Sequence, residues 1–197
     1  MERLQIYADC LERWGARINL VSAASMADLW RRHMLDSAQL VDLPPPRSTA
    51  LVDLGSGAGF PGLVIAILSG LPVRLVEADS RKAAFLGEAA RLTAAPATVH
   101  ASRIEAVSPM QVDVITARAL APLPKLLAYA APFMEISADR EPICLFLKGA
   151  KWQEELTAAQ KKWNMRADSL ASVSDPTGRV LVLGNLWRKE SAPKYER

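Results

Sequence analysis

The chain has 197 residues, half of them hydrophobic, which suits one α/β domain with a sizeable core and a smaller appendage. Lys and Arg number 24 against 21 Asp and Glu, a mild basic bias that is compatible with a nucleic-acid partner. Two cysteines, Cys10 and Cys144, exclude a disulfide framework, and the first residues contain no apolar signal core, so we expect a cytoplasmic protein. Prolines and glycines interrupt the uncharged run 54–73, which excludes a membrane span there.

Residues 1–46 are predicted to form a helical N-terminal appendage, followed by a larger domain over 47–197. Apolar residues recur at helical spacing over 2–20. Ser25 stands where a helix cap is expected, before a second helix that carries the basic cluster Arg31-Arg32-His33. Three consecutive prolines over 44–46 end this region.

The next segment reads as a strand, a glycine-rich turn and the start of a helix. Residues 50–54 are short and mostly apolar, as in a parallel strand that is buried on both faces. Gly55, Gly57 and Gly59 follow at alternate positions, where the missing Cβ permits a tight turn and lets the backbone approach a ligand closely. Pro61 suits the first position of the helix that follows.

This turn is compatible with three interpretations. It is a plain turn without a ligand, the G-x-G-x-x-G site of a nicotinamide or flavin dinucleotide, or the G-x-G-x-G turn of methyltransferases that use S-adenosylmethionine. Counted from Gly55, the last glycine of the dinucleotide pattern is replaced by Phe60, but counted from Gly57 it is Gly62. Glu77 ends the next predicted strand, 72–77, where an acid can accept hydrogen bonds from both ribose hydroxyls, so a nucleoside ligand is favoured.

From residue 50 onward, predicted strands alternate with predicted helices, which indicates a mainly parallel sheet. Asp79 and Ser80 are placed to cap a helix over 80–92, and further helices are expected over 122–131 and 153–163. Gly178 stands in a close turn that predicts a final antiparallel hairpin, and the tail from Lys189 is polar. The predicted strands are 50–54, 72–77, 98–101, 112–117, 143–147, 165–173 and 179–186.

Five short motifs in order along the chain resemble one known family, the bacterial guanine-N7 methyltransferases of small-subunit ribosomal RNA, also called glucose-inhibited division protein B. The longest is Gly55 to Gly62, G-S-G-A-G-F-P-G, which matches the family motif in full. Ala117 departs from the family, which usually has serine there, and residues 150–197 carry no motif that matches. The other four motifs are Trp14 with Ile18-Asn19-Leu20, His33-Met34-Leu35-Asp36-Ser37, Thr116 to Ala121, and Leu147-Lys148-Gly149.

The resemblance implies a class I S-adenosylmethionine-dependent methyltransferase: a Rossmann-like, seven-stranded, mostly parallel sheet with helices on both faces. It implies that Gly55 and Phe60 line the cofactor pocket, that Gly57 and Gly59 shape it, and that Arg118 lies near the reacting methyl group. Glu77, with Ala78 and Asp79 beside it, would hold the ribose, and Ile104 and Glu105 would flank the adenine.

The implied reaction is methyl transfer from S-adenosylmethionine to N7 of a guanine in 16S ribosomal RNA. Guanine N7 carries an available lone pair, so the absence of an obvious catalytic base agrees with it. Arg118 and Lys148, both at the ends of predicted strands, are the catalytic candidates, and Lys148 joins Arg31, Arg32 and His33 as a candidate RNA contact. For Asp36 we favour a structural hydrogen bond with His33, three residues away on one helix face.

We expect the substrate to be 16S ribosomal RNA, the small subunit or an assembly intermediate, with the target guanine single-stranded or flipped out. We expect a monomer with no metal and no membrane contact. Three alternatives remain: a nicotinamide-dinucleotide oxidoreductase, a non-catalytic RNA-binding or ribosome assembly factor that retains the glycine turn, and a methyltransferase that acts on a small molecule.

Overall fold

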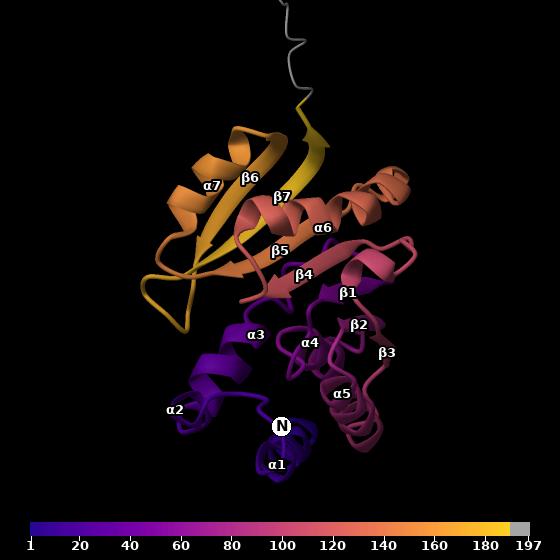
Figure 1. Cartoon of the computed structure of the whole chain (residues 1–197), viewed down its shortest axis with the longest axis vertical. Coiled ribbons are helices and arrows are strands. Elements are labelled where there is room, and N and C mark those ends of the chain that lie inside the picture. Colours follow the sequence, from indigo (N-terminus) through magenta and orange to yellow (C-terminus); the bar gives the residue numbers. More distant parts are fainter. Residues whose placement is uncertain (190–197) are drawn as a thin grey trace, which may run out of the picture.

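A computed structural model describes residues 1–189, and within them the chain forms one sheet of seven strands (Figure 1). Their spatial order is β3-β2-β1-β4-β5-β7-β6. All neighbouring strands are parallel except that β7 runs antiparallel to both β5 and β6. The strands are β1 (Leu51–Leu54), β2 (Val73–Glu77), β3 (Ala97–Ala101), β4 (Val114–Arg118), β5 (Ile143–Lys148), β6 (Trp163–Ala171) and β7 (Arg179–Arg188). The predicted α/β class, the mostly parallel sheet and the final antiparallel hairpin are confirmed.

Helices cover both faces of the sheet, as Figure 1 shows. The residues of β1 are all buried and alternate between the two sides: Leu51 packs with α1 (Glu2–Gly15), α4 (Gly62–Ser69) and α5 (Ser80–Leu92). Val52 and Leu54 pack on the opposite side with α6 (Leu123–Ile136) and α7 (Trp152–Gln160). Since both faces are apolar, the central strands read as continuous hydrophobic runs.

The N-terminal region folds as short helices against the first face. Leu4, Tyr7 and Leu11 of α1 belong to the same apolar cluster as α4 and α5. After α1 come α2 (Ala23–Met26), a π-helical turn η1 (Trp30–Leu35) and α3 (Asp36–Ala38). The helical character of residues 1–46 is thus observed, whereas their separation as a domain from 47–197 stays a prediction.

The first two helices differ in detail from the prediction. The first helix ends at Gly15 instead of residue 20, because glycine is a poor helix former. Ser22 caps α2, since its hydroxyl accepts a hydrogen bond from the backbone of Ser25, which therefore is not the cap.

Tertiary contacts also move two boundaries in the second half of the chain. The predicted helix 153–163 stops at Gln160, because Trp163 begins β6 and is 7% exposed there. Helix α6 continues through Pro132, where a stop was predicted, because Phe133 and Met134 in the next turn are buried in the core. Asp79 caps α5 as predicted, accepting from the backbone of Arg81 at 2.9 Å and of Lys82 at 3.3 Å. The predicted polar tail beyond Lys189 lies outside the described residues.

Candidate functional site

The glycine turn joins β1 to α4 at the carboxyl edge of the sheet. Gly55, Gly57 and Gly59 all have positive φ, +67°, +56° and +94°. A Cβ at Gly57 would meet only the Gly55 carbonyl oxygen, 3.9 Å away, so this part of the backbone faces open space. A Cβ at Gly59 would lie 2.8 Å from the Tyr7 hydroxyl and 3.0 Å from Leu63 Cβ, so Gly59 is needed for packing.

Glu77, at the end of β2, is oriented by two backbone groups. Its two carboxylate oxygens accept hydrogen bonds from the N–H groups of Gly57 and Asp79, each at 2.8 Å. Each oxygen has a further lone pair, so the carboxylate can accept from vicinal hydroxyls while the backbone holds it. The Gly57 bond ties this acid to the glycine turn directly.

A cavity of about 550 Å³ opens over the turn; we call it the glycine-loop cavity. It brings together eight of the residues predicted to bind the cofactor, whereas Gly59 and Asp79 do not line it. The open backbone at Gly57, the Glu77 carboxylate and the apolar Ile104 and Leu120 fit a nucleoside such as that of S-adenosylmethionine. The eight are Gly55, Gly57, Phe60, Glu77, Ala78, Ile104, Glu105 and Arg118.

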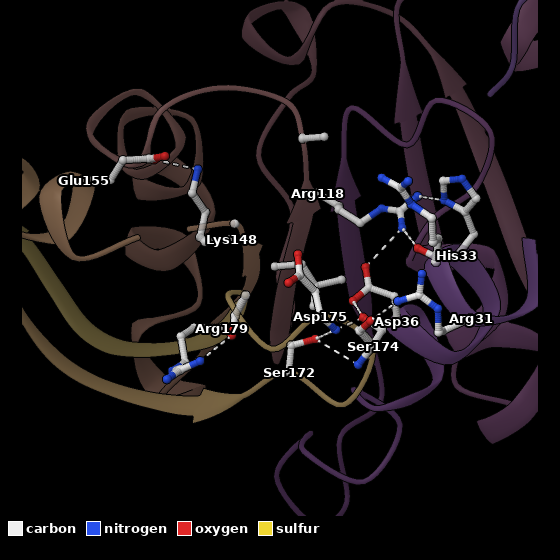
Figure 2. Close-up of a pocket in the computed structure, with 15 residues that line it drawn as sticks. Arg31, His33, Asp36, Arg118, Lys148, Glu155, Ser172, Ser174, Asp175 and Arg179 are labelled. Atoms are coloured by element: carbon white, nitrogen blue, oxygen red, sulfur yellow. Dashed lines mark hydrogen bonds and ion pairs between the residues drawn. The ribbon is translucent and has the colours of Figure 1, made fainter. Parts of the chain in front are cut away.

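A second cavity, of about 590 Å³, lies between the N-terminal helices and the loop that joins β6 to β7; we call it the basic cavity (Figure 2). Its walls hold Arg31, Arg32, Lys148 and Arg179, so the predicted basic residues are brought together. Arg118, His33 and Ala119 line both cavities and form their shared wall.

Arg118 holds this shared wall together. Its guanidinium donates to the Arg32 carbonyl at 2.9 Å and to Asp36 at 3.1 Å, and it lies 5.0 Å from the centroid of the Phe60 ring. It also contacts His33 Nδ1 at 2.6 Å, and the His33 ring stacks on Phe60 at 4.8 Å. The side chains of Arg118 and Asp36 are each 16% exposed, so one face of the pair still reaches the cavities.

The prediction of a hydrogen bond between His33 and Asp36 is wrong. Arg118 lies between them, and Asp36 instead accepts from Arg118, Gln39 and Ser174. A guanidinium has no acceptor, so Arg118 donates to His33 Nδ1 and the ring proton resides on Nε2. Burial and the adjacent Arg118 lower the pKa of His33 to about 4, so the ring is neutral near pH 7. Its Nε2 is buried without a partner among the described residues.

Lys148 sits in the wall of the basic cavity, but its charge is already paired. Its ammonium forms an ion pair with Glu155 at 2.6 Å and donates to the Ala121 carbonyl at 3.1 Å, and the side chain is only 9% exposed. The outer arginines differ: Arg31 donates to the Ser174 carbonyl and pairs with Asp28, while Arg32 is exposed and has no ion pair within residues 1–189.

Sequence reasoning missed a carboxylate beneath the turn. Asp53 is 1% exposed and accepts a hydrogen bond from the Thr116 hydroxyl at 2.6 Å, between β1 and β4. Burial raises its pKa to about 6 in spite of that bond. A Cβ at Gly62 would lie 2.6 Å from Asp53 Cβ, so the last glycine of the motif allows α4 to pack on this acid. An acid inside an apolar strand was the available signal.

Residues 1–189 contain neither a membrane-spanning helix nor a metal-ligand cluster. No helix of residues 1–189 is long and apolar enough to cross a membrane. The same part of the chain contains no cluster of three or more His, Cys, Asp or Glu side chains suited to a metal ion.

Solved structures share this architecture at low sequence identity, and such likeness shows the fold alone. A putative O-methyltransferase from Klebsiella pneumoniae has a TM-score of 0.58 at 14% identity, over 95% of this chain and 90% of that chain. M. jannaschii TYW2, solved in complex with AdoMet, has a TM-score of 0.59 at 14% identity, over 88% of this chain and 80% of that chain. The chain therefore has the fold of S-adenosylmethionine-dependent methyltransferases.

Sequence comparison is more specific. Residues 1–179 match the family described as rRNA small subunit methyltransferase G. A protein of Paramagnetospirillum magneticum with this name is 52% identical over 193 residues, 98% of this chain and 92% of its own length. A namesake from Rhodospirillum rubrum is 52% identical over 188 residues, 95% of this chain and 92% of its own. The chain thus belongs to the rRNA small subunit methyltransferase G family, a family of enzymes that use S-adenosylmethionine.

Proposed function

We propose that this protein transfers a methyl group from S-adenosylmethionine to N7 of a guanine in the RNA of the small ribosomal subunit. The names of its relatives support ribosomal RNA as the substrate, and the sequence resemblance implies guanine-527 as the target. One observation carries the proposal: a cavity that fits a nucleoside and a basic cavity share a wall made by Arg118, His33 and Ala119. A methyl donor in the first cavity would present its methyl group beside these residues, where a base that enters through the second cavity would meet it.

When bound, S-adenosylmethionine supplies a methyl group on a positively charged sulfur, ready for in-line displacement. The contribution of this chain is positioning, which can lower a barrier by several kcal/mol, up to about 7–11 in the best cases. We assign the ribose to Glu77, the adenine to Ile104 and Glu105, and the methionine end to Arg118. We assign phosphate contacts to Arg32 and Arg31, which line the basic cavity.

No proton acceptor is required for this reaction, because N7 of guanine carries no hydrogen and has a lone pair in the plane of the ring, outside the aromatic π system. His33 is neutral, and its Nδ1 already accepts a hydrogen bond from Arg118, so this nitrogen is not available as a base. A cysteine nucleophile of the kind needed for cytosine C5 is also not available: Cys10 and Cys144 are buried, and burial raises the pKa of each thiol. These features favour an unassisted attack by a ring nitrogen.

The test is transfer of tritium from labelled S-adenosylmethionine to small-subunit RNA, naked and as assembled subunits, from cells that lack this methylation. We expect label in 7-methylguanine, mapped by nuclease digestion and mass spectrometry, and a loss of at least a hundredfold in kcat for Arg118→Ala, the size of effect that a preorganised group at the reacting centre commonly has. Arg91→Ala is the matched control, because Arg91 pairs with Glu88 on the surface of α5 and lines neither cavity.

Label in a different atom or nucleotide would overturn the N7 assignment. Binding of RNA and S-adenosylmethionine without transfer would favour the alternative of an assembly factor. Titration calorimetry with NADH addresses the oxidoreductase alternative, since family membership predicts heat with S-adenosylmethionine and none with the dinucleotide.

A further inference from the structure

The loop between β6 and β7 forms a wall of the basic cavity and is fixed to the N-terminal helices. Arg31 donates to the Ser174 carbonyl at 2.6 Å, Gln39 accepts from the Val173 backbone at 3.0 Å, and the Ser174 hydroxyl bonds Asp36. Ser174 is only 7% exposed. This loop lies in the part of the sequence that carries no family motif, yet the structure builds it into the candidate substrate site.

Asp175, the next residue, is exposed and lines the cavity, and its carboxylate forms no ion pair within residues 1–189. Its Oδ1 accepts from the Thr177 backbone and hydroxyl, both at 2.8 Å, and Oδ2 has no hydrogen-bond partner within residues 1–189. The bonds to Thr177, together with the Gly178 backbone and the charge of the nearby Arg31, lower the pKa of Asp175, so it is ionised near neutral pH. In Figure 2 the Asp175 carboxylate points into the space between Lys148 and Arg118.

The other two carboxylates of the cavity are already matched by cations. Asp36 pairs with Arg118 at 3.1 Å, and Glu155 pairs with Lys148 at 2.6 Å. Among the three acids, Asp175 alone has no ion pair in the described part of the chain. A free acceptor with full charge is an unusual feature for a cavity that is otherwise lined by arginine and lysine and would receive RNA, because it repels phosphate.

The orientation of a guanine in the cavity follows from the proposed reaction. N7 must face the wall that the two cavities share, which Arg118 provides. The Watson–Crick edge, with the N1–H and N2–H donors, then points sideways, roughly at right angles to the direction of N7. The β6–β7 loop lines the basic cavity beside the shared residues and does not line the glycine-loop cavity, so it can meet an edge of the base other than the one that carries N7. Enzymes that act on a flipped base commonly read that edge by hydrogen bonds.

We propose that Asp175 accepts hydrogen bonds from N1–H and N2–H of the target guanine and thereby selects guanine over adenine. This inference rests on the proposed function. Adenine places an acceptor at N1 and has no amino group at C2, so the carboxylate would face an unpaired lone pair. Repulsion of the wrong base adds to the attraction of the right one.

The experiment compares two RNAs that differ only at the mapped target: one has guanine and one has inosine, which keeps N7, O6 and N1–H but lacks the N2 amino group. For the wild-type enzyme we expect kcat/KM to fall about ten- to a hundredfold with inosine, the range for one hydrogen bond to a charged group. For Asp175→Asn we expect slower methylation of guanine and a guanine-to-inosine ratio within about threefold of one, because the neutral amide gives up most of that charge-assisted bond.

Thr177→Ala is the matched control, because it removes the hydroxyl that holds Oδ1 but keeps the carboxylate. General damage to the loop lowers both rates together, so we expect this variant to retain the wild-type ratio. Either a wild-type ratio near one or an unchanged ratio in Asp175→Asn would overturn the role of Asp175 while methylation of guanine still supports the proposed function. No transfer by the wild type to N7 of either base would overturn both.

Discussion

The hydroxyl of Tyr7, on the first helix, donates a hydrogen bond to the backbone carbonyl of Ala58 in the glycine turn. Both residues are buried, and the Tyr7 ring also packs on Phe60 and Phe85 at centroid distances of 5.4 and 6.3 Å. The N-terminal helix therefore supports the turn through a buried side chain that does not itself line the glycine-loop cavity.

Tyr7→Phe should weaken both folding and cofactor binding. The change leaves the buried Ala58 carbonyl without its donor, which costs about 1–3 kcal/mol. We expect urea unfolding to show a loss in that range and calorimetry to show a Kd for S-adenosylmethionine raised about three- to tenfold. Gln5→Ala is the control on the same helix, since it removes only an exposed bond to Asp9. An unchanged Kd in Tyr7→Phe would mean that the turn holds its shape without this support.

Gly57 and Gly59 should respond differently to alanine. Gly70→Ala is the control that measures how much stability a positive φ alone costs. Gly70 has φ +74°, and an added Cβ would meet nothing within 4 Å. We expect Gly57→Ala to lose a similar 1–2 kcal/mol of stability but to bind S-adenosylmethionine at least tenfold more weakly. Gly59→Ala adds the contacts with Tyr7 and Leu63, so we expect a loss above about 3 kcal/mol, of the size of core overpacking plus strain. Equal unfolding midpoints for the two would contradict these roles.

Asp53→Asn should stabilise the protein in a pH-dependent way. The folded-state pKa of Asp53 is raised from 3.8 to about 6, so its contribution to stability is fully present below pH 3.8 and is lost as pH rises through 6. The amide mimics the neutral acid at every pH. We expect a gain of about 3 kcal/mol at pH 8 that largely disappears near pH 4, since the pKa shift is about two units and each unit is worth about 1.4 kcal/mol.

The control for this prediction is Thr116→Val. It removes the hydrogen bond that favours ionised Asp53, so its destabilisation should be larger at pH 8 than at pH 4. Denaturant unfolding of all three proteins at both pH values provides the comparison. A gain in Asp53→Asn that grows on acidification would show that the buried carboxylate is stabilised in its charged form.

Arg32 and Lys148 should affect RNA binding in distinct ways. Release of counterions makes the affinity fall with salt, with a log–log slope of about −0.7 to −0.9 per phosphate contact. Arg32 has no ion pair in the described residues, so Arg32→Ala should make the slope shallower by that amount. Lys148 is neutralised by Glu155, so Lys148→Ala should change the slope by less than half as much. Filter binding across a salt series measures both, and a larger change for Lys148 would show that the Glu155 pair opens on RNA.

Local patterns predicted most of the sheet and the nucleoside side of the site. Helix α5 and the positions of β1 and β2 follow from apolar runs and the Asp79 cap. The glycines and Glu77 are close in sequence and belong to one strand–helix–strand unit, β1–α4–β2. Such features depend on contacts within about twenty residues, which periodicity can capture.

The other wall of the site depends on contacts that a linear pattern does not show. Asp36 bonds Arg118 and Ser174 across the fold rather than His33, three residues before it. Helical spacing predicts that Trp163 belongs to a helix, but in the structure it pairs with Arg188 in the sheet. Spacing along the chain does not reveal this pairing. Asp175 lies in a loop whose docking on the N-terminal helices fixes its role, and nothing in its local sequence predicts that docking.

The junction between Ser174 and the first helices joins positions 143 and 138 residues apart, at Arg31 and Asp36. A chain emerging from the ribosome would therefore hold the glycine turn, Glu77 and Arg118 well before it holds a complete RNA-facing wall. Long-range closure of this kind is the slowest class of contact to form. During synthesis, the RNA-facing wall would therefore be the last part of the site to be completed.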